Sequence, residues 1–269
     1  MSKKHPDEIR ITVRDKYAEV ASRDSKACEC TPFPSCCGEP TVSLDDLGAL
    51  GGYSPEELSI APEGANMGLG CGNPQAIASL KPGETVVDLG SGGGFDCFLA
   101  AKKVGETGRV IGVDMTPEMV AKARENARKS DYTNVEFRLG EIEHLPVEDG
   151  SADVIISNCV INLSPEKVDV FREAYRILKP GGRLAIADVV ATAPLPPDMK
   201  NDLDLLSSCV SGAATVNEIE EMLLQTGFDD IEIQILEGSR ELIREWVPGR
   251  NVEEYIFSAT IEARKPSKE

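Results

Sequence analysis

The sequence contains little of what local metal and redox motifs are made from. Its 269 residues include two histidines, and its eight cysteines form no Cys-x-x-Cys pair. Zinc fingers and thioredoxin-like sites are built on such pairs, so both are excluded as interpretations. Four cysteines cluster near the N-terminus, at Cys28, Cys30, Cys36 and Cys37. A structural zinc ion or a disulfide is one interpretation of that cluster, and a loop of free thiols is the other.

Basic residues and long apolar runs are also scarce. There are 28 Lys and Arg against 46 Asp and Glu, which gives a net charge of −18. Nucleic acids and anionic membrane surfaces attract clustered positive charge, so neither is expected as a partner. No run reaches the roughly 18 apolar residues that span a bilayer, and no apolar segment follows the lysines of MSKKHPDEIR. We therefore expect no membrane span, no secretory signal and a cytoplasmic location.

A regular alternation of strands and helices occupies the middle of the chain. With 41% hydrophobic residues, the chain has enough apolar surface for one large domain. Strand-like and helical segments that alternate are typical of a mostly parallel sheet with helices on both faces. We predict strands over 85–89, 109–114, 135–139, 153–157 and 183–188, and helices over 95–104, 117–129 and 165–178.

The segment before this alternation mixes helices with irregular chain. A helix is predicted over 6–21, where Val13 and Tyr17 lie on its apolar face. Ser54 and Glu57 have the spacing of a capping box that opens a second helix. A Gly- and Asn-rich loop over 62–74 follows. Loops of that kind inside a folded protein commonly lie against a ligand.

The segment after the alternation predicts an α+β extension. Lys-Pro-Gly-Gly at 179–182 is typical of a helix stop. Beyond it, a capped helix is predicted over 215–226, followed by strands over 231–236 and 255–262. The fold class is therefore α/β, with extensions on both sides of the central sheet.

A strand that runs into a glycine-rich loop and then a helix is the sharpest motif. Asp88 and Gly90 open the loop and Gly94 closes it. A nicotinamide fingerprint needs glycine where this chain has Phe95, so that fit fails. Asp114 ends the next strand, where a carboxylate can accept hydrogen bonds from both ribose hydroxyls of an adenosine ligand. An adenosine-containing cofactor is the expectation.

This stretch resembles motif I of the class I S-adenosylmethionine methyltransferases, over residues 80–190. The resemblance implies a Rossmann-like, doubly wound sheet, S-adenosylmethionine as cofactor, S-adenosylhomocysteine as product and no catalytic metal. It also implies that Asp114 binds the ribose and that Met115 packs near the adenine. The cofactor-binding residues that it implies are Asp88, Gly90, Ser91, Gly92, Gly94, Asp114, Met115, Glu141, Ile142 and Asn158.

Three cysteines far apart in sequence fall on loops around this predicted site. Cys71 lies in the glycine-rich loop, Cys159 follows the fourth strand and Cys209 follows the fifth. A buried cysteine is usually a small apolar residue, and Cys97 is predicted to be one. Three thiolates that converge would suit a soft acceptor such as trivalent arsenic, which forms three bonds to sulfur and keeps a lone pair.

Five stretches of the sequence closely resemble the arsenite S-adenosylmethionine methyltransferases. In that family the cysteines matching Cys71, Cys159 and Cys209 bind the arsenical, and a fourth forms a disulfide with the one matching Cys71. Cys36 and Cys37 are the candidates for that partner here, with Cys28 and Cys30 nearby, and a loop that serves only as a tether is the alternative. The matching stretches are GANMGLGCGNP at 64–74, DLGSGGG at 88–94, DMTP at 114–117, SNCVINL at 157–163 and CVSGA at 209–213.

The resemblance also implies partners and a division of the chain. The expected partners are arsenite or its small-thiol conjugates and a reductant such as thioredoxin or a small thiol, acting on a monomer. The expected regions are an N-terminal cap over 1–75, a cofactor-binding domain over 76–190 and an arsenite-binding lid region over 191–269.

Two other functions remain open at this point. One is a methyltransferase for a small organic acceptor, with the cysteines incidental. The other is a thiol-rich protein that only sequesters metalloid. The glycine loop together with Asp114 weighs against sequestration, because a scavenger has no need of a methyl donor.

Overall fold

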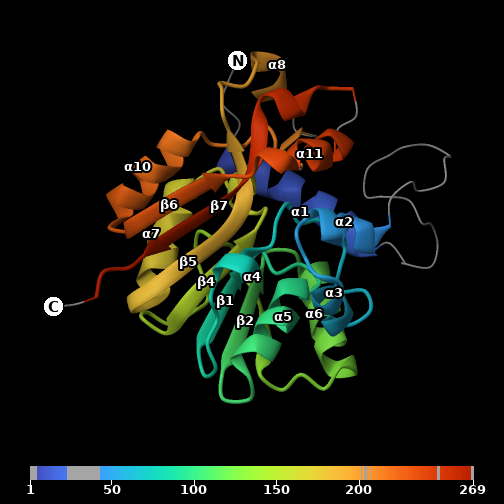
Figure 1. Cartoon of the computed structure of the whole chain (residues 1–269), viewed down its shortest axis with the longest axis vertical. Helices are drawn as coiled ribbons and strands as arrows, with labels where there is room; N and C mark the ends of the chain where they lie inside the picture. The colour runs from blue at the N-terminus through green and yellow to red at the C-terminus, as the bar shows by residue number, and fades with distance from the viewer. Residues whose placement is uncertain are drawn as a thin grey trace.

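A single seven-stranded sheet organises the protein (Figure 1). The structure is a computed structural model, which describes residues 5–22, 43–200, 202, 205–206, 208–246 and 249–267. The strands are β1 (Thr85–Leu89), β2 (Arg109–Asp114), β3 (Val135–Leu139), β4 (Ala152–Asn158), β5 (Leu178–Ala191), β6 (Asp229–Ile235) and β7 (Ile256–Arg264). The α-helices are α1 (Pro6–Ser22), α2 (Leu44–Leu50), α3 (Pro55–Ile60), α4 (Pro74–Ile77), α5 (Phe95–Val104), α6 (Pro117–Lys129), α7 (Lys167–Ile177), α8 (Pro197–Lys200), α10 (Val216–Thr226) and α11 (Arg240–Trp246).

The strand order is β3-β2-β1-β4-β5-β7-β6. The first five strands pair in parallel, and β7 enters antiparallel between β5 and β6. The order reverses between β1 and β4, where open α/β sheets bind ligands at the carboxyl ends of their strands. The predicted doubly wound α/β fold is confirmed.

Side chains that alternate along the strands build a core on each face of the sheet. On β1, Val87 and Leu89 join a cluster with α7 and α10, whereas Val86 joins one with α5 and α6. Figure 1 shows these helix pairs on opposite sides of the sheet. Burial on both faces explains why the parallel strands read as nearly continuous runs of Val and Ile.

A third cluster lies beyond the sheet faces and contains the candidate cysteines. Val13 of α1, Met199 of α8 and Ile243 of α11 pack in it together with residues that follow β4 and β5. Figure 1 places α1 and α11 close together at this end of the sheet. Residues from the N-terminal and C-terminal extensions therefore pack over the carboxyl ends of the strands.

The predicted helix ends are largely confirmed, with one correction. Ser54 and Thr215 each open a helix with a complete capping box. The stretch at 179–182, predicted as a helix stop before a strand at 183, lies inside β5. Leu178 already pairs with Ala152, and Arg183 resumes the pairing at Val154, so these four residues form an irregularity within one long strand.

No helix in the described part of the chain is long and apolar enough to cross a membrane.

Candidate active site

The glycine loop folds as its sequence predicts. Gly90, Gly92 and Gly94 have φ angles of 72°, 50° and 94°, values that side chains other than glycine rarely adopt. The loop turns back on β2, where the Gly92 amide donates to Oδ2 of Asp114 at 2.9 Å. The Thr116 amide donates to Oδ1 at 2.8 Å. The glycine loop and Asp114, which the sequence predicted to bind the same adenosine ligand, therefore lie in direct contact.

Two features of the loop fit a bound ligand. The Ser91 Oγ atom is buried and has no hydrogen-bond partner among the described residues. A Cβ placed on Gly92 would meet nothing within 4 Å. Almost all buried polar atoms in folded proteins form a hydrogen bond. A buried Ser91 hydroxyl with no such bond, next to open space, therefore indicates that a ligand supplies the partner. A cofactor with hydroxyl and amino groups would supply one.

Asp88 lies under the loop in a strongly acidic environment. Its Oδ2 atom accepts a hydrogen bond from the Cys97 thiol at 3.2 Å. Burial, together with the charge of Asp96, holds the pKa of Asp88 well above its usual range. Cys97 is fully buried, as predicted for a core residue, and its hydrogen bond to Asp88 lies in the interior.

The other residues predicted at the cofactor lie in different surroundings. Met115 packs against the cluster of cysteines, and Ile142 is buried in the core on the α7 side. Glu141 lies 3.7 Å from the Arg10 guanidinium. The Asn158 side chain bonds to the loop that carries Cys71. Their contacts with the cofactor remain predictions.

Cys71, Cys159 and Cys209 converge at the end of β4, although they are far apart in sequence. All three are free and buried, and all belong to the same cluster. The Cys209 thiol donates to the Cys159 carbonyl at 3.0 Å. The sulfurs of Cys71 and Cys159 and a carboxylate oxygen of Asp188 lie within 4.8 Å of one another. The Cys209 sulfur is not in that group, but its contact with the Cys159 carbonyl places it in the same buried cluster.

Two of these cysteines have unusual backbone conformations. Cys159 and Cys209 have φ angles of 56° and 60°. The left-handed region costs a residue with a Cβ about 1–2 kcal/mol. Hydrogen bonds from the Cys159 amide to Ala187 and from the Cys209 amide to Leu206, each 2.8 Å long, hold these conformations. Such strain gathers at functional sites, and here it occurs at two of the candidate ligands.

The thiols are held in their neutral form. Burial raises the pKa of Cys71 to about 11. The side-chain hydrogen bond with Cys159, followed by burial, raises the pKa of Cys209 well above its usual range. At neutral pH the site therefore presents protonated thiols.

Asp188 and Tyr17 complete the site and were not predicted. Asp188 accepts hydrogen bonds from the Ile161 and Val189 amides at 2.9 and 2.8 Å, and burial raises its pKa to about 6. The sequence feature that could have revealed Asp188 as a site residue is its position at the carboxyl end of the predicted strand over 183–188. Tyr17 packs against the cysteine cluster from α1, and its place on the apolar face of the predicted helix was the only sign.

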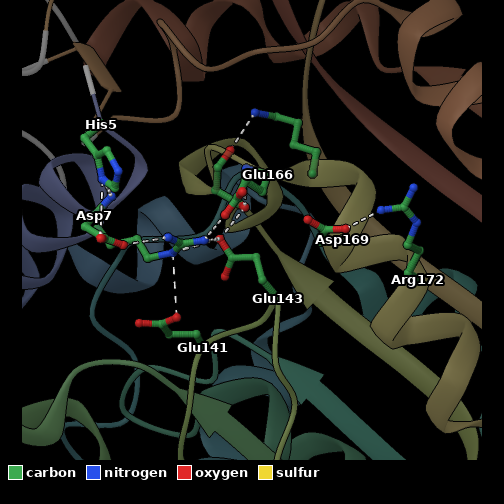
Figure 2. Close-up of polar contacts among 10 residues, drawn as sticks. His5, Asp7, Glu141, Glu143, Glu166, Asp169 and Arg172 are labelled. Carbon is green, nitrogen blue, oxygen red and sulfur yellow. Dashed lines mark hydrogen bonds and ion pairs between the residues drawn. The ribbon is translucent and has the colours of Figure 1, made fainter. Parts of the chain in front are cut away.

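Arg10 ties helix α1 to two loops of the domain, and Figure 2 shows how its partners Glu141, Glu143 and Glu166 gather near Asp7. The guanidinium forms ion pairs with Glu143 at 3.2 Å and with Asp7 at 3.3 Å, and another with Glu166. Glu143 is almost fully buried. Asp7 lies one turn before Arg10 on the same helix, whereas Glu143 and Glu166 come from two distant segments, so no local pattern in the sequence could reveal those two partners. Cys28, Cys30, Cys36 and Cys37 lie outside the described residues.

Comparison with known proteins identifies the family. A family model described as "Methyltransferase domain" matches residues 80–227. An arsenite methyltransferase of Halobacterium salinarum is 52% identical over 98% of this chain and 68% of that protein. This chain belongs to the arsenite methyltransferase family. The arsenite methyltransferase of Mus musculus is 38% identical over 82% of this chain, which spans 58% of the mouse protein. That of Aquipseudomonas alcaligenes is 45% identical over 64% of the chain, which spans 51% of its relative.

Solved structures agree with this family. The crystal structure of an arsenic(III) S-adenosylmethionine methyltransferase from Chlamydomonas reinhardtii superposes with a TM-score of 0.60 and 36% identity, covering 82% of this chain and 72% of that one. A Haemonchus contortus phosphoethanolamine N-methyltransferase, solved with S-adenosylhomocysteine, gives a TM-score of 0.61 at 22% identity, over 80% of this chain and 54% of that one. This second likeness shows the fold alone.

Proposed function

We propose that this chain is an enzyme that transfers methyl groups from S-adenosylmethionine to trivalent arsenic held by Cys71, Cys159 and Cys209. The observation that carries the proposal is the convergence of three buried free thiols at one end of the sheet. Membership of the arsenite methyltransferase family supports it. No observation favours an organic acceptor over arsenic.

The state of the thiols suits arsenite as the substrate. Arsenous acid is neutral, and three neutral thiols displace its three hydroxyl groups as three water molecules, so no proton is released. Raised thiol pKa values, such as that of Cys71 at about 11, therefore do not oppose binding. A zinc ion would require the thiols to lose their protons. The site favours arsenous acid over a hard or doubly charged cation.

The glycine loop and Asp114 hold the cofactor in this proposal. Asp114 binds the ribose hydroxyls, and the Ser91 hydroxyl and the space beside Gly92 receive other polar groups. S-adenosylmethionine supplies a methyl group on a sulfonium sulfur and is released as S-adenosylhomocysteine. The arsenic lone pair accepts the methyl group, so the acceptor atom needs no base. The work of the chain is then to position the arsenical and to exclude water.

The partners and the regions of the chain remain part of the proposal. Arsenite arrives free or as a conjugate of a small thiol. After methyl transfer the arsenic is formally pentavalent. The thiol of Cys36 or Cys37 attacks the Cys71 sulfur and releases its proton, and the electron pair of the Cys71–arsenic bond returns to arsenic, which is then trivalent again. Thioredoxin or a small thiol reduces the resulting disulfide of Cys71. The enzyme acts as a cytoplasmic monomer, with a cap over 1–75, a cofactor domain over 76–190 and a lid over 191–269.

The test is an assay of methylated arsenic with the purified, reduced protein. Arsenite, S-adenosylmethionine and excess small thiol are incubated with the wild type and with Cys71→Ser, Cys159→Ser and Cys209→Ser, and the arsenic species are separated and quantified. We expect each variant to lose about a hundredfold in rate, which corresponds to about 2.7 kcal/mol of lost stabilisation. Cofactor affinity should stay within about twofold of the wild type, since the cysteines do not hold the cofactor.

Cys97→Ser is the matched control, because it removes a buried thiol outside the trio and leaves a donor for Asp88. It should retain most of the activity. Full activity in all three variants of the trio would end the trithiol assignment. Stoichiometric binding of arsenite with no methyl transfer would identify a sequestering protein instead.

A further inference from the structure

We infer that Tyr53 is a positioning residue for Cys71 and that it acts through Asp96 and Asn158. The inference rests on the proposed function, because it assigns Cys71 to the arsenical. Three side chains from separate segments form a continuous hydrogen-bonded chain that ends on the Cys71 backbone.

Asn158, the last side chain of this hydrogen-bonded series, holds the loop that carries Cys71 in place like a clamp. The Cys71 amide donates to Oδ1 of Asn158 at 3.0 Å, and the Cys71 sulfur lies 3.9 Å from the same oxygen. Nδ2 of Asn158 donates to the Gly72 carbonyl at 2.8 Å. One amide group thus holds the backbone on both sides of the Cys71 side chain. Gly70 leaves room for it, since a Cβ there would lie 2.6 Å from Nδ2.

Tyr53 and Asp96 reinforce the orientation of the Asn158 amide that its bonds to Cys71 and Gly72 also require. With one Nδ2 hydrogen of Asn158 on the Gly72 carbonyl, the other is shared between the Tyr53 hydroxyl at 2.9 Å and Oδ2 of Asp96 at 3.2 Å. The Tyr53 hydroxyl donates in turn to Oδ1 of Asp96 at 2.8 Å. An ionised carboxylate only accepts, so the NH₂ group must face Asp96 and the carbonyl oxygen must face Cys71. A flipped amide would turn a donor toward the Cys71 amide and an acceptor toward the Gly72 carbonyl. Loss of Tyr53 would weaken the hold on the correct orientation and let the Cys71 loop move.

Cys71 has more need of such a clamp than Cys159 has. Cys159 follows β4 directly, and its amide bonds to β5, whereas Cys71 lies in a loop of bends and turns. Three thiols can bind one arsenic atom only if their sulfurs are held at fixed separations. Asp96 lies in the first turn of α5, which begins at the glycine loop, so the clamp also ties Cys71 to the cofactor side of the site.

Tyr53→Phe tests the inference because it removes one hydroxyl and keeps the ring. Arsenite binding to the full chain is measured by equilibrium dialysis under reducing conditions, in the wild-type and the Cys71→Ser backgrounds. The Tyr53 hydroxyl bonds to a buried carboxylate, and such charge-assisted bonds are strong, so we expect at least about tenfold weaker binding in the wild-type background. In the Cys71→Ser background the same change should have no further effect, because the clamped ligand is already gone.

Tyr132→Phe is the matched control. Its hydroxyl lies 3.5 Å from the Ile60 carbonyl, away from the cysteines, and its loss should leave arsenite affinity unchanged. The inference is overturned if Tyr53→Phe binds arsenite as the wild type does, or loses the same factor in both backgrounds, as general destabilisation would cause. If Cys71→Ser alone binds and methylates arsenite normally, the proposed function fails at this ligand, and the inference fails with it.

Discussion

At the scale of single residues, two glycines of the same loop are needed for different reasons. A Cβ on Gly94 would lie 2.7 Å from Phe137 and 2.8 Å from Phe98, at a φ of 94°. Gly92 has a φ of 50° but open space around it. The first glycine is required by packing, whereas the second leaves room for a ligand.

Substituting alanine for each glycine separates its role in packing from its role in ligand binding. Gly94→Ala should lower the melting temperature by several degrees, because the aromatic rings must move. Gly92→Ala carries about 1–2 kcal/mol of backbone strain without a clash, and its larger effect should be at least tenfold weaker binding of S-adenosylmethionine. Thermal melting and calorimetric titration of the cofactor measure the two effects. A Gly92→Ala protein with wild-type cofactor affinity would contradict the placement of the ligand beside the loop.

The sequence revealed the residues of the site that belong to local patterns. Asp88 and Asp114 stand at fixed places relative to strands, so their positions followed from the alternation. Tyr53 was not predicted, because its partners Asp96 and Asn158 come from other elements. The convergence of the three thiols likewise depends on the tertiary fold, which is why the sequence raised it only as a hypothesis.

At the scale of secondary structure, α1 depends on a buried ion-pair cluster for its place. The Arg10 guanidinium forms ion pairs with Glu141, Glu143 and Glu166. Removing one partner of a buried pair leaves an uncompensated charge, here that of Glu143. Tyr17 and Val13 of the same helix pack against the cysteine cluster, so loss of the anchor would also disturb this packing.

Arg10→Gln should therefore loosen α1. We expect amide hydrogen exchange over 6–22 to become at least about tenfold faster, while the strands of the sheet exchange as before. Arg14→Gln, which removes an exposed cation from the same helix, is the control and should change little. Equal protection of α1 in both variants would show that apolar packing alone holds the helix.

Most elements were predicted because hydrophobic periodicity reports burial. The first three strands were predicted with the observed bounds, and α10 began at its predicted cap. The error at 179–182 arose because a Pro-Gly-Gly turn resembles a helix stop, whereas here it bulges within β5. The short helices α2 and α4 were missed, since four to seven residues carry too little periodicity to be recognised.

At the scale of the whole molecule, negative charge opposes the compact state. The net charge is −18, and several carboxyl groups are buried besides. Burial, first among the causes, raises the pKa of Asp96 and that of Asp188 to about 6. An unfolded aspartate titrates near 3.9, so each group favours the folded state while it is protonated and loses that contribution as the pH rises through about 6.

The melting temperature should accordingly fall as the pH rises from 5 to 7. Groups with lowered pKa values, such as Glu136 at about 2, have already ionised in both states and do not change over that interval. Added sodium chloride should raise the melting temperature more at pH 7 than at pH 5, because screening matters most where the net charge is largest. A melting temperature that rises between pH 5 and 7 at constant salt would contradict the account.

The most direct test of the central claim is the number of sulfur atoms bound to arsenic. X-ray absorption at the arsenic edge would count them in the full chain carrying Cys28, Cys30, Cys36 and Cys37 as serine, so that the buried trio supplies the only candidate ligands apart from Cys97. The account predicts three sulfurs per arsenic and no more than two when Cys159→Ser is added. Arsenic still bound to oxygen, or three sulfurs retained without Cys159, would contradict it.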